Sequence, residues 1–126
     1  MWRLPATLLK GGTFAAIPSF EVDSSFALLG IGAAYTTRQF QIDYSPLFDL
    51  FVLFDQVGSA QLQTRAANAP PGDTWRNTGN PFAILANTPL VIVGQRVPNR
   101  QARWVISNTS GIALLTTEII VSNRSL

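Results

Sequence analysis

Apolar and polar side chains alternate along most of the chain with the period of a β-strand, and no helical period is sustained. Within residues 38–44, positions 40, 42 and 44 are apolar and positions 39, 41 and 43 are polar, as in a strand with one wet face. Residues 47–54 are apolar at both parities, which predicts a strand covered on both faces, inside the domain or by a neighbouring subunit. Gly58 and Ser59 then precede a second alternating segment, 60–65. We expect a hairpin formed by these last two segments.

Turn-forming residues separate the remaining apolar segments. Residues 66–80 are rich in Pro, Gly, Asn and Asp, which indicates a long loop, and Trp75 lies within it. Further strands are predicted over 82–85, 90–93, 101–107 and 112–121. Many short strands at regular spacing indicate an all-β fold class, a single antiparallel β-sandwich that is jelly-roll-like.

The first 25 residues differ from the rest because prolines and the Gly11-Gly12 pair break them into short pieces. We expect an extended N-terminal arm over 1–25 and a β-sandwich domain over 26–126. Since the arm is apolar, it should lie on another surface and not free in water. The arm residues expected to make subunit or capsid contacts are Trp2, Arg3, Leu4, Phe14, Ile17 and Phe20.

Composition narrows the class of protein. The chain has 126 residues, enough for one domain, of which 47% are hydrophobic and only 13% charged. A soluble domain ordinarily has about a quarter of its residues charged. The balance excludes intrinsic disorder and predicts a surface poor in charge, as in an extensive interface.

The positive charge is concentrated in the second half of the chain. Residues 64–126 hold six arginines against two acidic residues, a net charge of +4, whereas the whole chain has +2. Arginine suits planar pairing with carboxylates, so this half is expected to dock an acidic partner. Ion pairs within or between subunits are the plainer alternative, and the small net charge disfavours nucleic-acid binding. The expected contact residues are Trp75, Arg76, Arg96, Arg100 and Arg103, with Trp104 expected in the core.

The inventory of reactive side chains excludes several chemistries. Cys and His are both absent, so disulfides, thiolate nucleophiles, Cys/His zinc sites and histidine acid/base catalysis are excluded. Two carboxylate pairs, Asp49 with Asp55 and Glu21 with Asp23, are conceivable glycosidase pairs, but solvated carboxylates are the plainer interpretation. No calcium-loop or phosphate-loop pattern is present. We expect no catalytic residues, no cofactor and no metal.

Two further features of the sequence are expected to have no functional role. The sequons at Asn108 and Asn123 are interpreted as chance matches in polar turns. No uncharged run is long enough for a membrane helix, and the N-terminus lacks the apolar core of a secretion signal. We expect neither a membrane nor direct nucleic acid as a partner.

Residues 39–121 resemble the small β-sandwich or jelly-roll cement proteins that decorate the heads of tailed bacteriophages. The matching segments are FDLFVLFD (48–55), AQLQ (60–63) and RWVISNTSG (103–111). The resemblance implies a protein without an active site, present as a homodimer or homotrimer, that binds the outer face of the major capsid protein. It also implies location on the virion, after synthesis in the host cytoplasm.

The sequence thus predicts a non-enzymatic virion structural protein that bridges and stabilises capsid subunits. One alternative is a carbohydrate-binding module or tail-fibre-type adhesion domain, in which Trp75 and Tyr35 would stack on sugar rings. The other is an enzyme that uses carboxylates alone.

Overall fold

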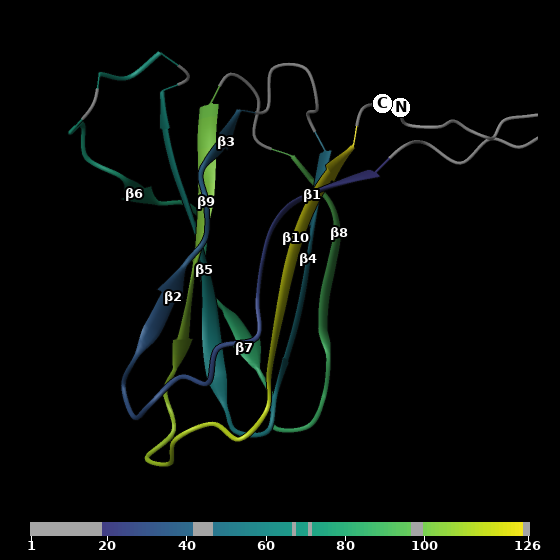
Figure 1. Ribbon diagram of the computed structural model, residues 1–126. Helices are drawn as coiled ribbons and strands as arrows, with labels where there is room; N and C mark the ends of the chain where they lie inside the picture. The colour runs from purple at the N-terminus through teal and green to yellow at the C-terminus, as the bar shows by residue number, and fades with distance from the viewer. Residues whose placement is uncertain (1–18, 42–46, 67, 71, 97–99, 125–126) are drawn as a thin grey trace, which may run out of the picture.

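The protein folds into two antiparallel sheets packed face to face (Figure 1). The computed structural model describes residues 19–41, 47–66, 68–70, 72–96 and 100–124. Sheet A contains, in spatial order, β1 (Ser19–Ser25), β10 (Thr117–Arg124), β4 (Leu47–Phe54) and β8 (Leu90–Arg96). Sheet B contains β2 (Ala34–Thr36), β9 (Arg100–Asn108), β5 (Gly58–Ala66) and β6 (Arg76–Asn77) in that order, with β3 (Phe40–Gln41) also on β9 and β7 (Phe82–Ile84) also on β5.

The strand pairs are nested along the chain. The first strand, β1, pairs with the last, β10; β2 and β3 pair with β9, β4 pairs with β8, and β5 pairs with β7. A chain folded back on itself as one long antiparallel ribbon and then rolled into two sheets gives this order, which defines a jelly roll. The predicted fold class is confirmed.

The core forms where the alternating positions of both sheets meet. In β4 the even positions from Phe48 to Phe54 are at most 1% exposed, while the odd positions are half-buried. Trp104 of β9 is fully buried, as expected, and makes an edge contact with the ring of Phe48 at 6.2 Å between centroids. Such a pair contributes about 0.5–1.5 kcal/mol beyond its buried area.

The expected hairpin of 47–54 with 60–65 is wrong. The first segment is β4 of sheet A and the second is β5 of sheet B, so the chain changes sheets between them. β4 takes its hydrogen bonds from β10 and β8, whereas β5 pairs with β9. A local turn signal at Gly58 is the same whether the chain returns beside itself or crosses to the facing sheet, and long-range pairing decides between the two.

Other predicted boundaries also shift. The strand predicted over 112–121 begins at Thr117, because residues 112–116 complete a connection between the sheets. Within the predicted strand 38–44, the structure describes the short β3, and residues 42–46 lie outside the described ranges. The end of the expected arm, Ser19–Ser25, forms β1, in which Val22 packs against the core; residues 1–18 lie outside the described ranges.

Gly58 stands where β5 begins and approaches its neighbours closely. A Cβ built at this position would lie 2.5 Å from the backbone oxygen of Ser107 and 2.8 Å from the ring of Phe54. The backbone oxygen belongs to the β5–β9 ladder, so it cannot move aside without disturbing the pairing of Gly58 with Asn108.

We therefore predict that Gly58→Ala lowers the free energy of unfolding by about 1–3 kcal/mol, the usual cost of overpacking. Urea denaturation followed by tryptophan fluorescence measures it. Gly30→Ala is the matched control, since a Cβ there meets nothing within 4 Å and the φ is not positive. A Gly58→Ala protein as stable as the Gly30→Ala protein would contradict the prediction.

Candidate interaction surfaces

Four connections between the sheets gather at the lower end of the sandwich in Figure 1. We call this end the tip; it comprises residues 26–33, 55–57, 85–89 and 109–116. It carries seven of the ten large hydrophobic side chains that are exposed among the described residues. They are Phe26, Leu28, Ile31, Val57, Leu85, Ile112 and Leu115, the last being 79% exposed.

The tip is almost without charge. Asp55 is the one charged residue in its four connections, and its carboxylate is occupied: Oδ1 accepts hydrogen bonds from the backbone N–H groups of Leu115 and Thr116, both at 2.9 Å. The Thr116 N–H, with the smaller contribution of the Leu115 N–H, holds the pKa of Asp55 below its ordinary value. The charge therefore anchors one connection to another.

A buried amide joins two of these connections from inside. Asn108, only 1% exposed, donates from Nδ2 to the carbonyl oxygens of Ile112 at 2.9 Å, Gly30 at 3.1 Å and Leu29 at 3.4 Å. Its Oδ1 accepts from the N–H and hydroxyl of Ser110 at 3.0 and 2.7 Å. The backbone bond from Leu114 N to Leu29 O, 2.9 Å, adds a further link. The sequon at Asn108 thus marks a structural clamp, and its amide nitrogen is not presented to solvent.

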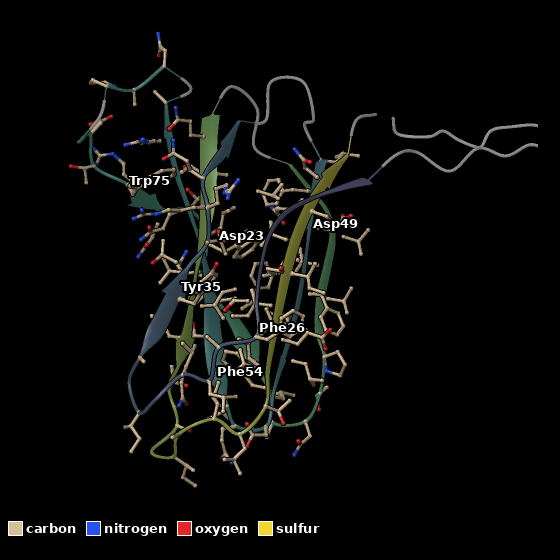
Figure 2. All side chains as sticks on the ribbon, in the orientation of Figure 1. Asp23, Phe26, Tyr35, Asp49, Phe54 and Trp75 are labelled. Atoms are coloured by element: carbon tan, nitrogen blue, oxygen red, sulfur yellow. The ribbon has the colours of Figure 1, made fainter. Side chains whose placement is uncertain are left out.

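A second candidate surface lies on the face of sheet B that points away from sheet A. The guanidinium carbons of Arg65 and Arg103 lie over the Trp75 ring, 4.5 and 4.4 Å from its centroid, and Figure 2 shows Trp75 beside β6. Each arginine Nε donates to a glutamine: Arg65 to Gln101 at 2.8 Å, and Arg103 to Gln63 at 2.9 Å. Burial, and then the like charge of Arg65, lower the pKa of Arg103.

The long loop is placed by its short strand. β6 pairs Gln63 with Asn77 and Thr64 with Arg76, and the Thr64 and Thr78 hydroxyls lie 2.7 Å apart. These bonds bring the residue before β6, Trp75, over the two arginines. Trp75 is half-buried there.

The predicted contact residues are only partly brought together. Trp75 and Arg103 meet in one cluster, whereas Arg76 is paired with Thr64, whose side chain faces inward, and so lies on the opposite face of sheet B. Trp2, Arg3, Leu4, Phe14 and Ile17 lie outside the described residues, as do the side chains of Phe20, Arg96 and Arg100.

Sequence reasoning missed Arg65. The available signal was parity. Gln61, Gln63 and Arg65 occupy alternate positions of β5 and therefore share one face, and they lie beside Arg103 only if β5 pairs with β9 in the observed register. That register, Gln63 opposite Arg103, is a long-range property.

The carboxylate pairs considered for catalysis are separated or occupied. Asp49 lies near the start of β4 and Asp55 just after its end, about 20 Å apart at roughly 3.3 Å per residue, beyond the reach of a glycosidase pair. Asp49 accepts a hydrogen bond from Gly94 N at 2.8 Å. Asp23 accepts from Tyr35 and from the Arg38 N–H, both at 2.7 Å, and the side chain of Glu21 lies outside the described residues.

Tyr35 and Trp75 do not form a common stacking platform. Tyr35 is opposite Ile106 in the β2–β9 ladder, so its ring lies on the core face, where it points to Asp23 (Figure 2). Burial, the hydrogen bond to Asp23 and the charge of that carboxylate raise the pKa of Tyr35 to about 12. Trp75 lies on the other face of the sheet, where guanidinium groups already cover its ring.

Metal and membrane features are limited in the described part of the chain. It contains no group of three or more His, Cys, Asp or Glu placed to hold a metal ion. Nor does it contain a helix with the length and hydrophobicity required to cross a bilayer.

Comparison with known proteins gives likenesses of structure. No family model and no curated protein matches the sequence. A solved structure of infectious bursal disease virus Gx strain is similar, with a TM-score of 0.46 and 12% identity, covering 96% of this chain and 36% of that one. The Drosophila melanogaster CENP-C cumin domain has a TM-score of 0.34 and 12% identity, covering 90% of this chain and 70% of that one. The protein thus spans little more than a third of the viral chain that it matches.

We predict that Asn108→Ala lowers the free energy of unfolding by about 1–3 kcal/mol, because the carbonyls that it bonds lose their partner inside the protein. Thermal and urea denaturation measure the loss. Thr109→Ala, at the exposed neighbouring position, should change stability by less than about 0.5 kcal/mol. Equal losses for the two variants would show that Asn108 does not clamp the tip.

Proposed function

We propose that this protein is a non-enzymatic structural component of a virion, a cement or decoration protein bound to the outer surface of a tailed-bacteriophage capsid. The observation that carries the proposal is the tip: an apolar, nearly uncharged surface held in place by internal hydrogen bonds. A monomer in water rarely exposes so many large apolar side chains together, and such patches mark interaction sites. The jelly roll, a fold that viral capsid domains also use, supports the same role.

We assign the tip to contacts between copies of this chain, in a homodimer or homotrimer. A surface without charge is complementary to itself, since two copies can meet without like charges facing each other. Symmetric oligomers are built from such repeated contacts, in which the same patch occurs on every subunit. The hydrogen-bonded connections are already ordered before two copies meet. Association therefore costs less conformational entropy than it would with mobile loops.

Absence of catalysis is part of the proposal. The described carboxylates that sequence offered as acid/base pairs serve as hydrogen-bond acceptors for backbone or hydroxyl groups. Asp49 and Asp55 also lie too far apart along β4 to act as one acid/base pair.

Charges placed at the tip should break the association. We predict that Ile31→Asp and Leu115→Asp each raise the dissociation constant of the oligomer about tenfold or more, because the copies would bury unpaired like charges. Analytical ultracentrifugation over a range of concentrations measures the constants.

Val93→Asp is the matched control, since Val93 is 65% exposed, close to the 68% of Ile31, but lies on β8 outside the tip. An equal effect of Val93→Asp would remove the tip from the interface. Wild-type protein that remained monomeric and sedimented with phosphatidylcholine vesicles would assign the tip to lipid instead.

The virion role is tested by counting copies. Quantitative mass spectrometry of purified particles from the source of this chain should find many copies per particle, in a fixed ratio to the major capsid protein. Mild denaturant should release them together while electron microscopy still shows closed shells. A handful of copies, or none, would contradict the decoration role.

A further inference from the structure

The arginines over Trp75 hold two positive charges, and no carboxylate of the described residues accepts a hydrogen bond from either of them. Among the described residues, the groups that accept hydrogen bonds from Arg65 are all neutral: the amide oxygens of Gln101 and Gln39, and the backbone oxygen of Asp73 at 3.3 Å. Arg103 donates to the amide oxygen of Gln63. The Asp73 carboxylate is turned to the N–H of Thr74, 2.9 Å away. The charges are therefore held close together by amides and an aromatic ring.

This arrangement fixes both guanidinium groups in advance. The Nε atom of each arginine donates to a glutamine side chain, and the guanidinium carbons lie 4.4–4.5 Å from the centroid of the Trp75 ring. Little side-chain freedom therefore remains to be lost on binding. The terminal nitrogens of Arg103 have no acceptor among the described residues. A guanidinium held in this way offers paired N–H donors to an oxyanion with two oxygens.

We propose that Arg65, Trp75 and Arg103 form a binding site for the carboxylates of an acidic segment of a partner protein. The inference rests on the proposed function, in which that partner is the capsid surface, and it names the chemistry of that contact. An incoming carboxylate relieves the repulsion between the two arginines and completes the hydrogen bonding of Arg103. The site is separate from the tip, because it lies on the outer face of sheet B.

The observations favour a protein carboxylate over a nucleic acid. Proteins that bind single strands need aromatic faces on which bases stack, and guanidinium groups already lie over the Trp75 ring. They also need a basic track along the backbone, whereas the neighbouring side chains here are neutral amides and the whole chain has a net charge of +2.

The test uses the emission of Trp75 in a Trp2→Phe background, with a short oligoglutamate peptide as the probe. Trp104 is fully buried and should contribute a constant signal, and Trp75→Phe in the same background identifies the part that responds. We expect the peptide to change the emission, with a dissociation constant that rises with sodium chloride.

Arg65→Gln and Arg103→Gln should each weaken peptide binding about tenfold or more, the loss expected when a charge-assisted pair is removed. Arg103→Lys should also weaken it, because the charge remains but the fork is lost. Arg76→Gln is the matched control: it removes the same charge next to Trp75 but on the opposite face, and should change binding by less than about twofold. Circular dichroism checks that each variant is folded.

Several results would overturn the inference. Equal losses of peptide affinity in Arg76→Gln and Arg103→Gln would show that net charge alone explains the binding. Inorganic phosphate that binds as tightly as the peptide would make the site one for a free anion, and tighter binding of oligothymidylate would make it a nucleic-acid site. Absence of peptide binding in the folded protein would also end the proposal, while the copy number in purified particles would still test the virion role independently.

Discussion

The buried side-chain amide of Asn108 holds connections of the tip in place, and the apolar surface of the tip depends on it. Connections between facing sheets have no ladder to satisfy their backbone groups, and those groups must find partners elsewhere. Asn108 bonds backbone groups of two connections, 26–33 and 109–116. Asp55 joins the connection 55–57 to 109–116 through backbone N–H groups. Because Asn108 meets these polar requirements from the inside and Asp55 meets them at the surface, the connections are held in place while their large apolar side chains face outward.

The molecule therefore has two surfaces of opposite character. The tip is apolar and nearly uncharged, while the outer face of sheet B carries amides and the paired arginines around Trp75. A protein that bridges subunits needs two contacts that do not compete, and these lie on different elements. In the proposed role one surface joins copies of the chain and the other meets the acidic partner.

Strand periodicity was sufficient to predict the all-β sandwich and the burial of Trp104, because both depend on which side chains share a face. It could not predict that β4 and β5 belong to different sheets, since the hydrogen bonds that decide this come from distant strands. For the same reason the sequence did not reveal Arg65 as a site residue, because Arg65 lies near Arg103 only when β5 pairs with β9 in the observed register. Asn108 was interpreted as a turn residue in a chance sequon, and its role depends on carbonyls contributed by residues about 80 positions earlier.

The nested pairing has a consequence for how the chain acquires its structure. The innermost pair, β5 with β7, joins residues close in sequence, whereas Ser19 meets Arg124 at the outermost. Closing a chain segment of that length is entropically costly, and long-range pairing of this kind slows folding. β10 lies between β1 and β4, so a partly folded chain in which β10 has not yet joined sheet A leaves one side of β4 without a partner strand. The apolar strand Leu47–Phe54 is then an open edge, and such a partly folded chain is prone to aggregate through it.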